Sequence, residues 1–262
     1  MQNAASLADK AFSFIQIMPR QAKPRTRGLT IMADRGMGLR KQADILEAAG
    51  EFIDLAKVGI GAYRLQNPEF VQRKVDLYHQ NQVEVFFAGD LSEIAFMQGV
   101  SERFYQEVKA FGAEAVEVSS AQVSMSLKDK LTLIKMAQDA GLKVIAEAGQ
   151  KANEQWTRCT GYILKQIESY FEVGAWKVLV QGEGLTEGVD RIKDDILLSI
   201  AGNFDLEKLI FQAKDAASQK WFISNLSADV NLDVDDDQVI DLELMRRGLR
   251  KRGLFGLVGA LK

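Results

Sequence analysis

Residues 115–149, AVEVSSAQVSMSLKDKLTLIKMAQDAGLKVIAEAG, contain one complete strand–helix–strand unit and decide the fold. The apolar runs Ala115–Ser119 and Lys143–Gly149 are short and rich in Val, Ile and Ala, which is typical of strands that are buried on both faces. Between them, Leu127–Ala140 carries apolar residues at helical spacing, with Ser126 as its capping residue and a glycine after it. The stretch therefore predicts two parallel strands joined by a helix.

Eight apolar runs of this kind occur in series along the 262 residues, and stretches with helical spacing separate them. The series predicts a single-domain α/β fold, a (β/α)8 TIM barrel over residues 28–262, preceded by a lead-in segment over residues 1–27. An open doubly wound sheet is the main competitor, but the first run is not followed by the complete glycine motif that binds dinucleotides in such sheets. The other predicted strands are Gly28–Asp34, Phe52–Gly59, Val83–Gly89, Trp176–Gln181, Lys208–Ala213 and Asp229–Asp233.

The composition excludes several classes of function. The 33 basic and 36 acidic residues are spread along the chain, without the basic stripe that nucleic-acid binding needs. One cysteine, Cys159, and one histidine, His79, cannot build an internal disulfide or a Cys/His zinc centre, and we expect His79 on the surface of the second helix. No apolar run approaches the roughly 18 residues of a membrane span, and no secretion signal is recognisable. We therefore expect a soluble, cytoplasmic protein.

Charged residues inside two of the apolar runs indicate where function lies. In such barrels the reacting groups lie where strands end and the following loops begin. Lys57 and Glu147 lie within apolar runs, where a buried charge costs several kcal/mol unless a partner or a ligand compensates it. Two interpretations stay open for Lys57: an internal ion pair with an acid on a neighbouring strand, or a contact to a substrate anion. Glu117 and Glu147 are suited either to pair with Lys57 or to hold one Mg²⁺ through their oxygens.

Four segments in sequence order resemble the phosphosulfolactate synthase family, and the similarity extends from about Phe12 to Phe255. The run IDLAKVGIG is similar to the family's Ile-Asp-Phe-Val-Lys-Phe-Gly-Trp-Gly, and AEAGQK is similar to its Glu-Val-Gly-x-Lys element. DLELMRRGLR resembles the C-terminal Leu-Glu-x-Leu-Arg-x-Gly-Leu-Arg, and the lead-in carries the family's Pro-x-Arg and Lys-Pro-Arg elements. These segments are Phe12–Gly28, Ile53–Gly61, Ala146–Lys151 and Asp241–Arg250.

The resemblance implies a lyase that adds sulfite to phosphoenolpyruvate in a Mg²⁺-dependent reaction. On this resemblance Lys151 is the general acid, Lys57 binds the substrate anion, and Glu117 and Glu147 hold the metal ion. Without it, Lys151 reads as a solvated loop lysine. The expected partner is a small anionic substrate, and a homo-oligomer stays open. A helical arginine near the C-terminus, such as Arg247, is more often a surface or interface residue. The residues expected to bind substrate are Asp34, Arg35, Asp90, Ser119, Gln181, Gln212, Asn231 and Arg247.

Departures from the family pattern fall at the predicted strand ends. Gln181 and Gln212 stand where the family carries acids, and Asp90 stands where it carries a threonine. An amide keeps a neutral oxygen ligand but not a negative charge, so metal affinity should fall and substrate preference should change. Two alternatives therefore stay open: a barrel that acts on another small phosphorylated or carboxylated substrate, and a non-catalytic relative like the plant heat-stress-associated members of the group.

Overall fold

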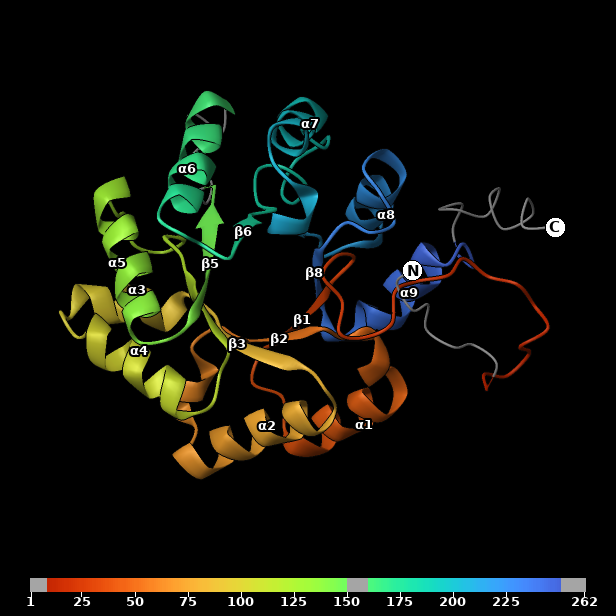
Figure 1. Cartoon of the computed structure of the whole chain (residues 1–262), viewed down its shortest axis with the longest axis horizontal. Helices are drawn as coiled ribbons and strands as arrows, with labels where there is room; N and C mark the ends of the chain where they lie inside the picture. The colour runs from red at the N-terminus through yellow and green to blue at the C-terminus, as the bar shows by residue number, and fades with distance from the viewer. Residues whose placement is uncertain (1–8, 150–159, 251–262) are drawn as a thin grey trace.

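Eight parallel strands close into a barrel within the residues that the structure describes, 9–149 and 160–250 (Figure 1). The structure is a computed structural model. The strands follow one another around the barrel in sequence order, and β8 pairs with β1 to close it. Closure confirms the predicted (β/α)8 barrel and excludes the open sheet. The strands are β1 Thr30–Asp34, β2 Leu55–Val58, β3 Glu84–Phe87, β4 Ala115–Val118, β5 Lys143–Ala148, β6 Lys177–Val180, β7 Leu209–Gln212 and β8 Leu232–Asp235.

Helices pack around the outside of the barrel (Figure 1). Some of them begin at a residue whose side chain caps the helix: Ser126 accepts a hydrogen bond from the Asp129 N–H, as predicted, and Asn67 accepts one from the Phe70 N–H. In the described ranges, no helix is long and apolar enough to cross a membrane. The helices are α1 Leu39–Ala49, α2 Pro68–Gln80, α3 Asp90–Met97, α4 Ser101–Ala110, α5 Leu127–Asp139, α6 Thr160–Glu172, α7 Asp194–Asn203, α8 Ala216–Asn225 and α9 Val239–Arg246.

Apolar side chains fill the lower interior of the barrel and leave polar ones above them. Leu55, Ala115, Ile145, Leu179 and Ile210 belong to this interior cluster. Alternate residues of a strand face the same side of the sheet. The residue two positions after each of these five therefore also points into the barrel, nearer the C-terminal end of its strand. Those five residues are Lys57, Glu117, Glu147, Gln181 and Gln212. The fold therefore gathers the polar side chains at the end of the barrel where such folds carry function.

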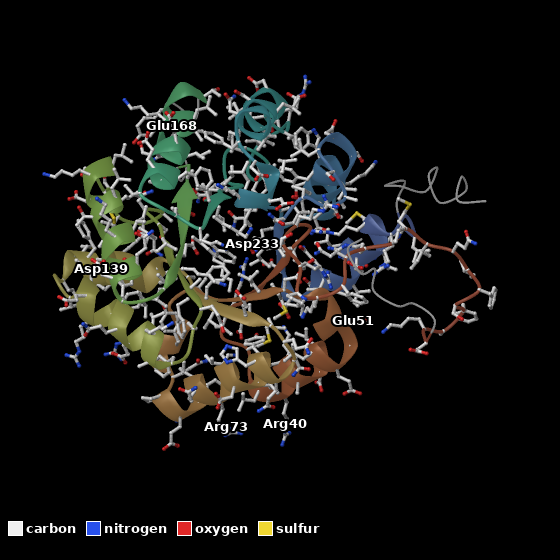
Figure 2. The ribbon with its side chains drawn as sticks, viewed as in Figure 1. Arg40, Glu51, Arg73, Asp139, Glu168 and Asp233 are labelled. Carbon is white, nitrogen blue, oxygen red and sulfur yellow. The ribbon has the colours of Figure 1, made fainter. Side chains whose placement is uncertain are left out.

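The last strand lies later in the chain than the sequence predicts. We expected a strand over Asp229–Asp233, whereas β8 covers Leu232–Asp235. Asp233 is therefore an internal residue of the strand, and Figure 2 shows it near the middle of the ring, far from the helix-borne Asp139 and Glu168 at the rim. The boundary was misplaced because inward-facing acids interrupt the apolar run before the strand ends.

Candidate active site

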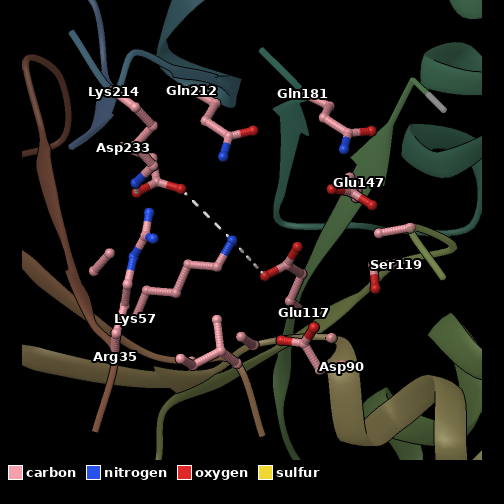
Figure 3. Close-up of a pocket in the computed structure, with 16 residues that line it drawn as sticks. Arg35, Lys57, Asp90, Glu117, Ser119, Glu147, Gln181, Gln212, Lys214 and Asp233 are labelled. Carbon is pink, nitrogen blue, oxygen red and sulfur yellow. Dashed lines mark hydrogen bonds and ion pairs between the residues drawn. The ribbon is translucent and has the colours of Figure 1, made fainter. Parts of the chain in front are cut away.

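A cavity of about 220 Å³ opens at the C-terminal ends of the strands (Figure 3). Each strand, or the residue directly after it, contributes to the lining. Most of the predicted site residues meet there: Arg35, Lys57, Asp90, Glu117, Ser119, Glu147, Gln181 and Gln212. The expectation for Lys151 concerns a residue outside the described ranges.

Lys57 forms an ion-paired centre in this cavity. Its Nζ lies 2.9 Å from Glu117 Oε2 and 3.5 Å from Asp233 Oδ2 (Figure 3). Burial by itself would lower the pKa of Lys57, but the carboxylates of Glu117 and Asp233 raise it above its usual value. The ammonium group therefore stays charged at any physiological pH.

The sequence predicts that an ion-pair partner of Lys57 lies on a neighbouring strand. The two observed partners lie on other strands. Glu117 lies on β4 and Asp233 on β8, each two strands away from β2 on opposite sides. In a closed barrel, side chains from alternate strands share one layer of the interior, so these three groups meet although their strands are not adjacent. An ion pair thus exists, and its geometry follows from closure.

Glu147 is an acid of the cavity that forms no ion pair with the described residues. Its side chain is buried, and among the described residues its Oε2 has no hydrogen-bond partner. Burial, and after it the charge of Glu117, raise the pKa of Glu147 to about 7. The side-chain oxygen of Gln181 likewise has no hydrogen-bond partner within the described ranges. Glu147 and Gln181 therefore present two buried oxygens that a cation, a proton or a ligand can use.

Lys214 and Arg35 bring further positive charge to the mouth of the cavity. Lys214 Nζ pairs with Asp233 Oδ1 and lies 3.4 Å from Asp235 Oδ1, while Arg35 Nη2 lies 3.0 Å from the same Asp235 oxygen. Burial alone would raise the pKa of Asp233, but Lys214 and Lys57 lower it, so this carboxylate stays ionised. The sequence places Lys214 and Asp233 near the predicted strand ends but assigns neither to the site. Asp233 carries the same signal as Glu147, an inward acid within an apolar run.

Glu93, on α3, shapes the loop that follows β4. Its buried carboxylate accepts hydrogen bonds from the backbone N–H groups of Ala121, Gln122 and Val123, each at 2.8 Å, and from the Ser119 hydroxyl. Ser119 is therefore held in place by Glu93. The sequence reading missed Glu93, because nothing in a helical pattern marks which of its acids turns toward a neighbouring loop.

Asp34 does not line the cavity, although we expected it to bind substrate. Ala33 points into the cavity, so Asp34, the next residue of β1, faces outward. There its carboxylate lies 2.6 Å from Lys74 Nζ and accepts a hydrogen bond of 2.7 Å from the Tyr78 hydroxyl. Asp34 therefore ties β1 to α2.

Asn231 and Arg247 also lie away from the cavity, at the opposite end of the barrel. Asn231 precedes β8, where its side chain accepts from the Leu29 N–H and donates to the Leu209 carbonyl at 2.7 Å. Arg247 follows α9 and donates to Glu243. Their positions correct the expectation that they bind the substrate. His79 is exposed on α2, as predicted.

The described residues contain no group of three or more His, Cys, Asp or Glu side chains arranged to hold a metal ion. The acids of the cavity are instead separated by cations: Lys57 stands between Glu117 and Asp233. A metal ion at this site would therefore need ligands other than a cluster of carboxylates.

Comparison with known proteins identifies the family. Residues 18–252 match the family described as (2R)-phospho-3-sulfolactate synthase (ComA). The chain is 31% identical to a phosphosulfolactate synthase of Methanothermobacter thermautotrophicus over 92% of this chain and 96% of the relative. It is 32% identical to one of Methanocaldococcus jannaschii over 92% and 97%. A protein of Arabidopsis thaliana named HEAT-STRESS-ASSOCIATED 32 is 24% identical over 89% and 91%.

A solved structure supports the fold independently. The crystal structure of 3-hexulose-6-phosphate synthase from Salmonella typhimurium superposes with a TM-score of 0.57 and covers 84% of this chain and 100% of that one. The two sequences are 13% identical, so this likeness concerns the fold alone. The family match, in contrast, covers nearly all of the described barrel and agrees with the resemblance seen in the motifs. The chain belongs to the (2R)-phospho-3-sulfolactate synthase family.

Proposed function

We propose that this protein is a phosphosulfolactate synthase-like lyase that forms a carbon–sulfur bond by adding sulfite to phosphoenolpyruvate. The observation that carries the proposal is the convergence of Lys57, Glu117 and Glu147 on one cavity in a chain of this family. Two relatives at 31% and 32% identity bear the name phosphosulfolactate synthase. The cavity also lies at the end of the barrel where such folds carry out chemistry.

The reaction requires that negative charge be stabilised beside the substrate carboxylate. The sulfur lone pair of sulfite attacks the methylene carbon, the electron pair of the carbon–carbon double bond moves toward the carboxylate, and the adjacent carbon then takes up a proton. The bond between oxygen and phosphorus stays intact. Lys57 has a raised pKa, so it serves this step as a fixed cation and not as a proton donor. The proton donor in the proposal is Lys151, which lies outside the described residues.

Glu147 and Gln181 fit Mg²⁺ as its protein ligands. Mg²⁺ in proteins is usually held by one or two carboxylates and completes its shell with water and substrate oxygens. Glu147 Oε2 and Gln181 Oε1 are buried oxygens without hydrogen-bond partners among the described residues, whereas Glu117 already pairs with Lys57. Bound there, Mg²⁺ would supply positive charge next to the substrate carboxylate.

The amides have separate tasks in this proposal. Gln212 Oε1 accepts a hydrogen bond of 3.0 Å from the Gly182 N–H, so it holds the loop after β6. That loop begins with Gln181, which keeps its own side chain at the cavity. Gln212 therefore orients Gln181, and Gln181 offers the ligand oxygen.

The charge balance of the cavity supports a cation requirement. Among the described lining residues the cations are Arg35, Lys57 and Lys214, and the acids are Asp90, Glu117, Glu147 and Asp233. A multiply charged anion would enter this surplus of acids unfavourably unless Glu147 is protonated or a metal ion neutralises it. Turnover should therefore depend on Mg²⁺ even though amides replace two acids of the family pattern.

A second candidate keeps the cavity and changes the substrate. Gln181 and Gln212 remove two negative charges relative to the family pattern, and this favours another small phosphorylated or carboxylated acid. The similarity to HEAT-STRESS-ASSOCIATED 32 also keeps a non-catalytic binding role open. In that role, ligands should stabilise the protein without being converted.

The test is product formation from phosphoenolpyruvate and sulfite, followed by mass spectrometry with Mg²⁺ and with a chelator. We expect product only with Mg²⁺, and loss of product in Lys57→Met and Glu147→Gln. Lys165→Met and Glu168→Gln, at exposed positions of α6, are matched controls that should retain full activity.

Other outcomes would replace the proposal. Turnover of a different phosphorylated acid, with none of phosphoenolpyruvate, would establish the second candidate. Stabilisation by such acids without any turnover would establish a binding role.

A further inference from the structure

A second polar cavity lies at the N-terminal end of the barrel, opposite the candidate active site. Its volume is about 380 Å³, within the range of roughly 300–1,000 Å³ typical of small-molecule sites. Lys23 and Arg25 of the lead-in segment line one side and Arg247, just after α9, lines another. Figure 1 shows the lead-in, in red, running beside α9. None of the chemistry proposed above uses this cavity.

Positive charge exceeds negative charge around this cavity. The described carboxylates there are the buried Asp54 and Glu243 and the exposed Glu51, which lines the cavity. Glu243 pairs with both Arg20 and Arg247, and Asp54 lies 3.6 Å from Arg25 Nε. The described cations around these two acids are Arg20, Lys23, Arg25, Arg246 and Arg247.

Backbone carbonyls accept hydrogen bonds from Lys23, Arg25 and Arg246 without cancelling the charge of these side chains. Lys23 Nζ donates to the carbonyls of Gly50 at 2.8 Å and Gln82 at 3.1 Å, and Arg25 Nη2 donates to the Glu51 carbonyl. Arg246 donates to three carbonyls, including that of Val230 at 2.9 Å. A buried charge is costly unless an opposite charge compensates it, and carbonyl dipoles do this only in part.

Some side-chain N–H groups of Arg25 make no hydrogen bond to the described residues. Its side chain is only 5% exposed, and its Nε and Nη1 have no hydrogen-bond partner among the described residues. A guanidinium group is a planar fork of donors that matches the oxygens of phosphate or carboxylate. Arg25 Nε already faces Asp54, so Nη1 is the donor that has no partner among the described residues and is suited to an anion at the cavity.

We propose that this cavity is a second anion site, which binds a small phosphate-bearing ligand through Arg25, Lys23 and Arg247. The ligand would supply the missing negative charge and would bridge the lead-in to the end of α9. Because the cavity lies at the far end of the barrel from the reacting groups, its occupant acts as a stabilising or regulatory ligand and not as the reacting substrate.

The test is the thermal unfolding of the full chain with inorganic phosphate, measured against sodium chloride at equal ionic strength. Phosphate should raise the melting temperature of the wild type and also that of Lys57→Met above its own phosphate-free value, because Lys57 lies in the cavity at the other end of the barrel. The shift should be lost in Lys23→Met and in Arg25→Met, each compared with its own phosphate-free value. Calorimetry should give a phosphate Kd at least about tenfold weaker in Lys23→Met, because a charge-assisted contact is lost.

Two results would overturn the proposal. One is an equal shift with chloride and phosphate, which would mean general screening of the arginines. The other is a phosphate shift that persists in Lys23→Met and disappears in Lys57→Met, which would place the anion in the active-site cavity. Arg25→Met could fail to fold because Asp54 loses its partner. Lys23→Met still tests the proposal, since Lys23 donates to carbonyls alone among the described residues.

Discussion

Replacing Lys57 by methionine should destabilise the protein strongly and in a pH-dependent way. Among the described residues, Lys57 is the cation paired with Glu117, whereas Asp233 keeps Lys214. Removing one partner of a buried ion pair costs about 3–5 kcal/mol, because the remaining charge is uncompensated. We therefore expect Lys57→Met to lose about that much unfolding free energy at pH 8.

The pH dependence follows from Glu117. Burial already raises its pKa above the ordinary value of 4.5, and loss of Lys57 would raise it further. Between the unfolded and folded pKa values, the folded variant binds more protons than the unfolded chain. Its stability, relative to the wild type, therefore falls as the pH rises above 4.5, by up to about 1.4 kcal/mol per pH unit. At pH 5 most of the loss should be absent.

Urea unfolding followed by circular dichroism at pH 5 and pH 8 measures both effects. Lys165→Met, at an exposed position, should stay within about 0.5 kcal/mol of the wild type. The double variant Lys57→Met/Glu117→Gln should recover much of the loss at pH 8, because an amide leaves no buried charge. A loss below about 1 kcal/mol at pH 8, or one of equal size at both pH values, would refute the reasoning.

Three further predictions concern single side chains. Burial raises the pKa of Glu147 to about 7, so wild-type stability should fall as the pH rises from 4.5 to 7. At pH 8, urea unfolding should show Glu147→Gln to be more stable than the wild type by up to roughly 3 kcal/mol. An unchanged pH dependence of stability in this variant would contradict the prediction. Gly89→Ala should cost about 1–3 kcal/mol, because the added Cβ would lie 2.1 Å from Ser119 Oγ, whereas Gly38→Ala meets nothing within 4 Å and should be nearly neutral by thermal unfolding. Asp34→Asn should lower the unfolding free energy by about 3–5 kcal/mol, because buried Lys74 loses its partner, but it should leave KM unchanged. A raised KM would show that Asp34 contacts the substrate.

The barrel and about half of the residues that line its cavity could be predicted from the sequence, because both depend on local patterns. Short apolar runs mark the strands, and an inward charge within such a run, as at Lys57 and Glu147, marks the layer above the apolar interior. The phase of the alternation is harder to read. A shift of one residue moves a side chain to the other face of the sheet, which is why Asp34 was expected at the cavity and lies against α2.

Contacts across the barrel could not be predicted from chain order. Lys57 meets Glu117 and Asp233 because closure brings alternate strands into one layer. Asn231 was misplaced with the boundary of β8, and Arg247 lies at the opposite end because α9 runs back toward the start of the strands. Such positions depend on register and closure, which no local pattern contains.

Phosphorus NMR of the wild-type protein with phosphoenolpyruvate, sulfite and Mg²⁺ tests the central claim most directly. The account predicts that the signal of phosphoenolpyruvate is replaced by that of a new phosphate ester, without free phosphate, because only the carbon–carbon double bond reacts. An unchanged phosphoenolpyruvate signal, or release of inorganic phosphate in its place, would contradict the account.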